Sequence, residues 1–349
     1  MKAGGFTGKF IFILFLAATL LFAAIAAVAL GSFSIPIKSV AQVLVQEVPV
    51  ISAFFQFDPV SKPISTVILQ VRLPRVILAI LVGAALSTAG AVYQALFRNP
   101  MADPYVIGIS SGGALGAVIA FLAGLNLSFW GISTIPFFSF LGSLITAFIV
   151  YQLAKTGDKV PVASLLLSGL AVGAFISSIL SFLLIVNGED LHRIFFWLLG
   201  GLSARNWSHV RMCLPFFTVG LFFSIIFAKD LNISLLGEER AHHLGIEVER
   251  LKKIIFVFTS MLVAAAVSVS GLIGFVGLMT PHIIRLIIGP DHRYLVPASA
   301  LGGGLFLLIA DLFARTVLSP TEIPVGIVTA FFGVPFFIFL LKRRKHVLF

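Results

Sequence analysis

The charged side chains that could bind a partner are few, and they lie at the ends of apolar stretches. Arg72 and Arg75 flank a Leu-Pro pair, and Asp311 precedes Arg315 by four residues. Residues four apart share one face of a helix, so Asp311 and Arg315 can form an ion pair. The chemistry available to these residues is therefore electrostatic, and the sequence by itself indicates that the arginines anchor helix ends at the membrane interface.

Metal and thiol chemistry have no suitable set of residues in this sequence. Cys213 is the single cysteine, so we expect no internal disulfide and no thiolate metal cluster. His242 and His243 are adjacent and would point in different directions, and no cysteine or paired carboxylate accompanies them. We therefore expect no metal site, no catalytic residue and no cofactor bound by this chain.

A nucleotide-binding loop is not predicted either. The phosphate-binding pattern has two glycines separated by four residues before Lys and Ser or Thr. The nearest approach, Gly4 to Lys9, has the wrong spacing and lacks the final hydroxyl. The glycines from Gly108 to Gly116 open an apolar segment, where small residues favour close helix packing. Any ATP that this protein depends on must therefore be bound by another chain.

The elements that must position these residues are membrane helices. The chain has 349 residues, of which 59% are hydrophobic and 11% charged, whereas soluble domains carry about 25% charged residues. The pattern predicts an all-α, polytopic membrane helix bundle of about ten helices that occupies residues 1–349 as a single transmembrane domain. The apolar segments are 10–31, 76–97, 106–124, 132–153, 162–187, 210–227, 254–271, 274–288, 295–314 and 324–341. Because glycines join the seventh and eighth segments, nine spans or a broken helix remain alternatives.

The net charge of +10 is distributed as in a membrane protein rather than a nucleic-acid-binding one. Basic residues concentrate at the ends of apolar segments. If both termini lie inside, the inner ends carry about twice as many basic residues as the outer ends, as the positive-inside rule expects. We therefore expect a multi-pass protein of the inner (cytoplasmic) membrane with both termini in the cytoplasm, and no nucleic-acid partner.

The longest polar interruption on the expected inner side runs from Lys229 to Lys253. It contains two glycines, Gly237 and Gly245, and several leucines among charged residues. Composition alone allows two interpretations. The segment is either a solvated connecting loop or a short helix that docks a cytoplasmic partner.

Seven short segments of the sequence, taken together and in their order along the chain, identify a protein family more specifically than any one of them does alone. They are RLPR from Arg72, GAALSTAGAVYQALFRNPMADP from Gly83, LGIEVERLK from Leu244, GFVGLMTPHIIR from Gly274, DHR from Asp291, ADLFAR from Ala310 and EIPVGIVTAFFGVPFFIFLL from Glu322. Together they resemble the signature segments of the FecCD-type permease family, the transmembrane subunits of type II ABC importers for iron-siderophores, haem and cobalamin. The resemblance covers most of the chain from residue 72 onward.

This resemblance implies a function and a set of partners. The chain would be the permease subunit of a binding-protein-dependent ABC importer, moving a ferric siderophore or a similar chelate, such as haem or cobalamin, into the cytoplasm by ATP-driven alternating access. Its partners would be a cytoplasmic ABC ATPase dimer, which uses ATP and Mg, an extracytoplasmic substrate-binding protein and a second permease copy. That copy would be identical or a paralogue.

The resemblance also assigns roles to particular residues. The segment from Gly237 to Val248 resembles the coupling helix that sits in a cleft of the ATPase, and the representative contact residues are Gly237, Glu239, Arg240, Leu244 and Gly245. Docking of the binding protein falls on Arg72, Arg75 and Arg315. The polar pair that family members often carry before the fifth helix, where it narrows the inner exit, is Val162 and Ala163 here, so a gate assignment does not transfer.

Two other classes of membrane protein are alternatives. An ion-coupled secondary transporter usually needs ionisable groups at mid-membrane, and Asp311 near the outer end is a poor candidate. A membrane-embedded enzyme needs a catalytic constellation, and the sequence offers neither paired intramembrane carboxylates nor a histidine cluster.

Overall fold

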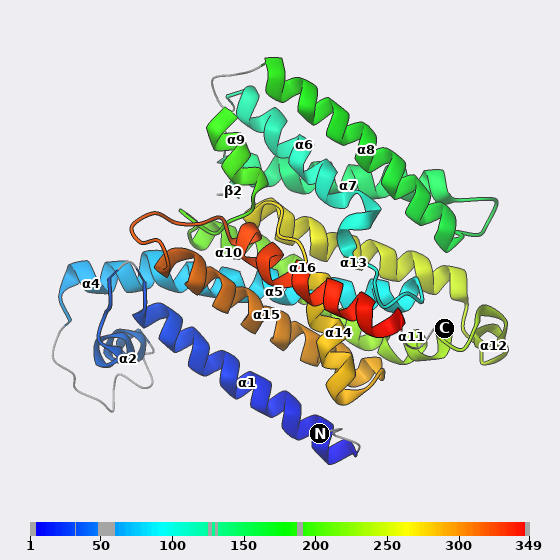
Figure 1. The fold of residues 1–349 in the computed structure, drawn as a ribbon, viewed down its shortest axis with the longest axis horizontal. Coiled ribbons are helices and arrows are strands. Elements are labelled where there is room, and N and C mark those ends of the chain that lie inside the picture. The colour runs from blue at the N-terminus through cyan, green and yellow to red at the C-terminus, as the bar shows by residue number, and fades with distance from the viewer. Residues whose placement is uncertain are drawn as a thin grey trace.

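The protein is a bundle of long helices in a computed structural model that describes residues 5–31, 33–47, 60–124, 128–129, 132–186 and 191–345. Within these ranges the only strands are β1 (Ser128–Phe129) and β2 (Ile132–Ser133), which pair as a small antiparallel hairpin. Seven helices are long and apolar enough to cross a membrane, and three further apolar helices are shorter. The predicted all-α membrane bundle is therefore confirmed (Figure 1).

Each of the ten predicted segments corresponds to one of these helices. They are α1 (Phe6–Ala29), α5 (Leu73–Leu96), α6 (Ile109–Leu122), α7 (Thr134–Ala154), α8 (Val162–Val186), α10 (Trp207–Ile226), α13 (Val248–Ser270), α14 (Val276–Ile288), α15 (His292–Thr316) and α16 (Val325–Lys345). Of the shorter elements that connect them, the sequence analysis anticipated only a short helix in the polar segment 229–253, where α11 (Ala228–Ser234) and α12 (Glu238–His243) lie. The others were not predicted: α2 (Ile37–Gln46), α4 (Lys62–Thr66), the π-helical turn η1 (Val67–Arg72), the 3-10 turn η2 (Pro104–Ile107) and α9 (Leu191–Leu198).

Helix α5 forms the centre of the bundle. It continues α4 and η1 without interruption, so that one helix runs over Lys62–Leu96, and 89% of its most apolar window is buried. A Cβ added to Gly83 would lie 2.2 Å from the carbonyl oxygen of Gly303 on α15, and one added to Gly90 would lie 1.7 Å from that of Gly277 on α14. Since no real Cβ fits at these distances, glycine allows the three backbones to touch.

The glycines at the start of α6 also serve helix packing. A Cβ on Gly112 would lie 2.5 Å from the carbonyl oxygen of Gly142 on α7, and one on Gly116 would lie 2.1 Å from that of Phe138. The packing interpretation of this glycine-rich stretch is therefore confirmed.

Two helices stop inside the bundle. With 13 residues in α14 and 14 in α6, each spans about 20 Å, less than the roughly 30 Å hydrocarbon core. The chain that enters α14 is extended and paired: the backbone N–H of Ile273 donates to the Tyr105 hydroxyl at 2.6 Å, and that of Gly201 donates to the Ser270 carbonyl at 2.8 Å. Non-helical backbone is tolerated at membrane depth only where protein surrounds it. The seventh and eighth predicted segments are therefore two separate helices, α13 and α14, joined by the non-helical residues 271–275.

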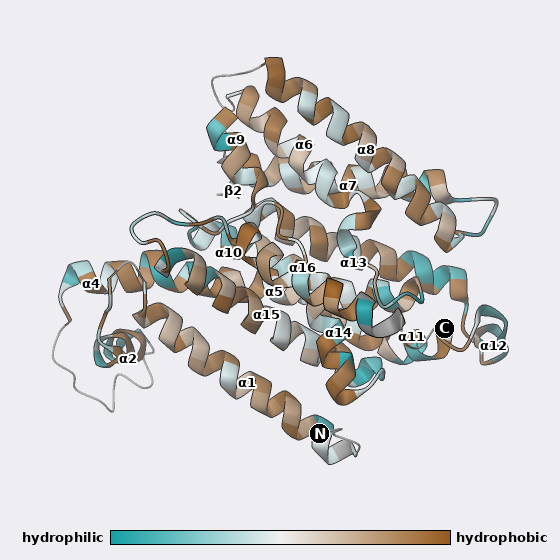
Figure 2. Ribbon diagram, viewed as in Figure 1, coloured by the Kyte–Doolittle hydropathy of each residue, from teal (hydrophilic) through white to brown (hydrophobic). Residues whose placement is uncertain are grey.

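The polar residues lie mainly toward the two ends of the bundle (Figure 2). One end carries α4 and the outer parts of α5 and α15, and the opposite end carries α11, α12 and the turn between α14 and α15. The N-terminal helix begins, and the C-terminal helix ends, on the side of α12 (Figure 1). Both termini therefore share one end of the molecule, as the even number of helices requires.

Candidate functional site

The polar segment between α10 and α13 folds into two short helices at that end of the bundle. α11 ends at Ser234 and α12 covers Glu238–His243. Gly237 precedes α12 with φ +117° and Gly245 follows it with φ +84°. A side chain would strain the backbone in this region, which glycine adopts readily. The two glycines therefore set the turns that separate α12 from its neighbours.

The predicted coupling residues lie on the exposed side of this segment, which we call the coupling segment (228–247). Glu239, Arg240 and Gly245 are exposed, and Leu236 and Leu244 are 55% and 59% exposed. Exposed leucines among charged residues are typical of a surface that binds another protein. Of the two interpretations of the loop, the short helix is correct, and its contact with an ATPase remains a prediction.

A buried lysine links the coupling segment to α13 and to the turn before α8. Lys252 Nζ lies 2.8 Å from Glu238 Oε1, at the start of α12, and 2.8 Å from Glu249 Oε1. Glu249 Oε2 accepts a hydrogen bond of 2.8 Å from the backbone N–H of Val160. Lys252 is only 9% exposed, and hydrogen bonds between charged groups are stronger than neutral ones. We call these four residues the Lys252 network.

Glu238 is charged in this network at neutral pH. The hydrogen bond from Lys252 lowers the pKa of the Glu238 carboxyl below its ordinary value, although partial burial acts in the opposite direction. The bond to Lys252 therefore persists until the pH falls well into the acid range.

The Lys252 network borders the position that the resemblance associates with a gate. Val162 and Ala163, the first residues of α8, line a cavity of about 470 Å³ together with Glu238 and Lys252. A displacement of α12 can therefore be transmitted through Lys252 and Glu249 to Val160, just before the N-terminal end of α8. The sequence did not reveal this route because Lys252 looks like one more solvated lysine in a charged loop.

A second set of bonds attaches α11 to the start of α15. The Asn232 amide nitrogen donates to Asp291 Oδ1 at 2.7 Å, and its oxygen accepts from the backbone N–H of His292 at 2.9 Å. Arg98, just after α5, donates to the Ser234 carbonyl at 2.9 Å. Hydrogen bonds from Arg293 and Asn232 lower the pKa of Asp291 despite partial burial. The coupling segment is thus bonded to α13, to the start of α15 and to Arg98 just after α5, and through α13 it is connected to the turn that opens α8.

The three arginines predicted to dock a binding protein lie together at the opposite end of the bundle. Arg72, Arg75 and Arg315 are 5%, 9% and 5% exposed. The guanidinium of Arg72 donates to the carbonyl oxygens of Val28 at 2.9 Å and Ala29 at 2.7 Å, which end α1. Arg72 therefore caps the C-terminus of α1, where the last carbonyls have no helical partner.

Two carboxylates hold the other arginines. Arg75 binds both oxygens of Asp311, with Nε at 3.0 and 3.1 Å, and its Nη1 lies 2.8 Å from Glu322 Oε1. The expected pair between Asp311 and Arg315 is present, with Arg315 Nε 3.6 Å from Asp311 Oδ2. Burial alone would raise the pKa of Glu322, but hydrogen bonds from Arg75 and Ser203 outweigh it and lower that pKa. We call Arg72, Arg75, Asp311, Arg315 and Glu322 the outer arginine cluster.

This geometry gives the arginines a structural role, namely anchoring the ends of α1, α5 and α15 to each other. None of the three guanidinium groups is open to solvent in this conformation. Docking of a binding protein through them remains a prediction. Asp311 is fully buried between Arg75 and Arg315, so it is not a vacant intramembrane carboxylate of the kind an ion-coupled carrier needs.

Metal ligands are not gathered in the part of the chain that the structure describes. In the ranges given above, no group of three or more His, Cys, Asp or Glu side chains could hold a metal ion. Cys213 is buried, and burial places its thiol out of contact with solvent.

Comparison with known proteins identifies what this arrangement resembles. The FecCD transport family matches residues 19–343. The cobalamin import system permease protein BtuC of Halobacterium salinarum is 41% identical over 92% of this chain and 89% of its own length. The hemin transport system permease protein HmuU of Yersinia pestis is 39% identical over 80% and 84%. A solved structure described as an inward-facing conformation of a metal-chelate type ABC transporter has 31% identity and a TM-score of 0.81, covering 95% of this chain and 98% of that one.

Proposed function

We propose a working mechanism for this chain, which belongs to the FecCD transport family and is the transmembrane permease subunit of an ABC importer. In this mechanism the chain pairs with a second permease copy, identical or paralogous, and hydrolyses no ATP itself. An ABC ATPase dimer on the cytoplasmic side uses ATP and Mg, and a substrate-binding protein delivers cargo from outside.

The orientation follows from charge. The end that carries both termini and the coupling segment faces the cytoplasm, because basic residues are concentrated there. The outer arginine cluster then faces the binding protein. Its three arginines and two carboxylates leave an excess positive charge, and such a field speeds the approach of an acidic partner surface. Docking around Arg72, Arg75 and Arg315 is consistent with this charge.

The coupling segment carries the mechanism. The coupling segment offers the ATPase an exposed surface formed by Leu236, Glu239, Arg240 and Leu244. Lys252 and Asn232 bond the same segment to α13 and to the start of α15, and Glu249 of α13 continues the connection to the turn before α8. ATP binding draws the ATPase subunits together and moves the coupling segments with them. The attached helices follow, and the path between the two permease copies opens to the other side.

The cargo is a metal chelate: a ferric siderophore, haem or cobalamin. Relatives named for cobalamin and for hemin are 41% and 39% identical to this chain, so identity alone does not select one cargo. The binding protein is the main source of specificity.

Reconstitution tests this proposal. Proteoliposomes would contain the permease, its ATPase and its binding protein, with labelled ferric siderophore, haem or cobalamin offered outside and ATP trapped in the compartment that the ATPase faces. We expect accumulation of one chelate that requires all three proteins and hydrolysable ATP. Accumulation driven by an ion gradient without the ATPase would contradict the mechanism. An ATPase variant that binds but does not hydrolyse ATP is the matched control.

A further inference from the structure

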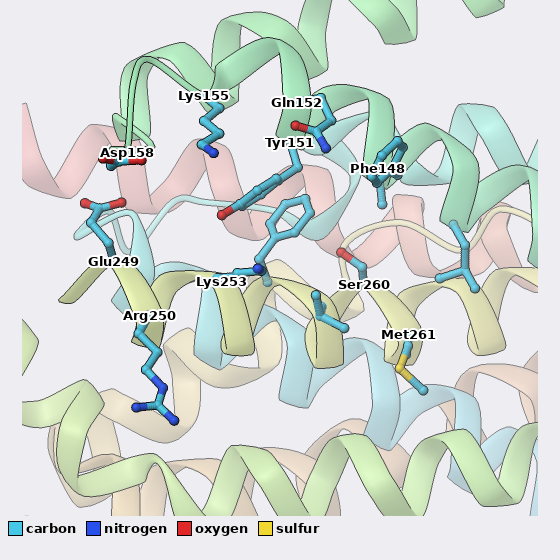
Figure 3. Close-up of a pocket in the computed structure, with 14 residues that line it drawn as sticks. Phe148, Tyr151, Gln152, Lys155, Asp158, Glu249, Arg250, Lys253, Ser260 and Met261 are labelled. Carbon is cyan, nitrogen blue, oxygen red and sulfur yellow. The ribbon is translucent and has the colours of Figure 1, made fainter. Parts of the chain in front are cut away.

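A groove between α7 and α13 has two chemically different ends. It has a volume of about 630 Å³ and runs from Lys155 and Glu249 at one end to Phe148 and Met261 at the other (Figure 3). Glu249 lies at the start of α13, directly after the coupling segment. The end of the groove farther from the coupling segment is lined by Phe148 of α7 and by Val257 and Met261 of α13. Lys155, at the end of α7, and Lys253 of α13 lie at its other end. At 1.5 Å per residue, about 10 Å of helix separates Lys155 from Phe148, and about 12 Å separates Lys253 from Met261.

The charged end of the groove has cations in excess. Its charged lining residues are Lys155, Lys253, Arg250, Asp158 and Glu249. Both oxygens of Glu249 are occupied, one by Lys252 and one by the backbone N–H of Val160. Arg250 lies 3.6 Å from Glu247, and Figure 3 shows its guanidinium directed away from the groove. Lys155 and Lys253 are therefore opposed mainly by Asp158.

The two lysines are available to a ligand. Both are exposed, and in the part of the chain that the structure describes neither forms an ion pair with another side chain. The aromatic ring of Tyr151 lies between them at the entrance (Figure 3). At the other end, Phe148 is 62% exposed and Val257 is 46% exposed. An exposed apolar surface, formed by Phe148 and Val257, thus lies next to the two lysines in the same groove.

We propose that this groove binds one anionic phospholipid of the cytoplasmic leaflet. Lys155 and Lys253 contact the phosphate of the headgroup, and one acyl chain lies along Phe148, Val257 and Met261. The order of cationic and apolar surface matches that of an amphiphile entering from the cytoplasmic side, and basic pockets between membrane helices on that side bind anionic headgroups. This proposal goes beyond the transport mechanism and takes from it only the orientation of the bundle.

Other occupants fit this surface less well. A free inorganic phosphate would use the lysines and leave the apolar wall empty. A second copy of this chain would cover the apolar wall, but it gives no reason for two unopposed lysines beside it. A lipid contacts both the lysines and the apolar surface. The experiment below distinguishes a lipid from inorganic phosphate and from a second copy of this chain.

Quenching of a tryptophan by brominated lipids tests the proposal. Phe148→Trp places a reporter in the groove, and the protein with its three native tryptophans gives the background. The full permease–ATPase complex is reconstituted in bilayers that contain either dibrominated phosphatidylglycerol or dibrominated phosphatidylcholine. Since each lysine near the membrane surface favours an anionic lipid by about fivefold, we expect phosphatidylglycerol to be preferred at the reporter by at least about fivefold.

Two charge variants make the test specific. Lys155→Gln with Lys253→Gln should bring the preference to about one. The matched control, Lys159→Gln with Lys342→Gln, removes two exposed lysines near the same end, outside both the groove and the coupling segment, and should preserve the preference.

Four results would overturn the proposal. The first is equal quenching by the two lipids, and the second is loss of the preference in the control variant. The third is abolition of the preference by inorganic phosphate, which would assign the lysines to a free anion. The fourth is a reporter shielded from both lipids, which would indicate a second protein chain in the groove. If Phe148→Trp does not assemble, Met261→Trp in the same groove replaces it. No transport is measured, so failure here is separate from failure of the transport mechanism.

Discussion

Replacing Lys252 with methionine should uncouple ATP hydrolysis from transport. Methionine fills much of the space of the lysine stem but cannot bind Glu238 or Glu249. Glu249 would keep its bond to the Val160 N–H, so the turn before α8 stays attached to α13. The substitution removes the link from this site to α12 and a longer bond, at 3.4 Å, from Lys252 to the Val160 carbonyl. The ATPase would still move the coupling segment, and α8 would follow it less closely.

The contacts set the size of the effect. A hydrogen bond to a charged group is worth about 1.5–3 kcal/mol, and exposure of a partner reduces that value. The side chains of Glu238 and Glu249 are 52% and 30% exposed, whereas that of Lys252 is 11% exposed. We therefore assign the link about 1–3 kcal/mol, which corresponds to a change of about 5–150-fold in a coupled equilibrium. The lower part of this range applies because Asn232 provides a parallel connection.

The assay measures chelate uptake and phosphate release in the same proteoliposomes. We expect Lys252→Met to lower the number of chelates moved per ATP by at least about fivefold, while the ATPase still copurifies with the permease. The matched control is Lys159→Met, which removes an exposed lysine from the turn before α8 and should leave the ratio unchanged. A wild-type ratio in an intact Lys252→Met complex would refute the assignment of this network to coupling.

Three further predictions address other parts of the molecule. Arg75→Met should destabilise the protein by about 3–5 kcal/mol because it leaves Asp311 buried without its bidentate partner. Thermal unfolding in detergent should show this loss, and a double variant with Asp311→Leu should recover part of it. Gly90→Ala should prevent correct packing of α5 on α14, seen as loss of the folded peak in size-exclusion chromatography, whereas Gly274→Ala, with nothing within 4 Å of the added Cβ, should elute normally. Leu244→Asp places a charge on the exposed face of the coupling segment and should weaken ATPase binding by about tenfold or more, measured by pull-down, with unchanged thermal stability of the permease alone.

Hydropathy predicted the long helices because burial in lipid demands apolar residues along each span. It missed the outward extension of α5 back to Lys62, where polar residues interrupt the apolar pattern. It also missed α2 and α9, which are too short to cross a membrane. Local composition carries little information about such elements, because their contacts with the rest of the bundle determine them.

The candidate sites were predictable only where their residues are close in sequence. The pair of Asp311 and Arg315 followed from its four-residue spacing. Glu322 and the Lys252 network did not, because each joins segments that only the folded chain brings together. The family resemblance predicted the position of the coupling segment, and Gly237 and Gly245 indicated the turns on either side of α12. Its bonds to α8 and α15 depend on tertiary structure.

The outer arginine cluster fixes one end of three long helices, so a rotation about this point displaces mainly their opposite ends. Bonds from Arg72, Arg75 and Arg315 pin the outer ends of α1, α5 and α15 together. A rod that is held at one end moves most at the other. Helix α5 has 24 residues and is about 36 Å long, so a tilt of about 5° about the pinned end displaces its inner end by about 3 Å. A rotation too small to break the arginine contacts thus produces, at the end that carries the coupling segment, a displacement of the size that the proposed mechanism needs.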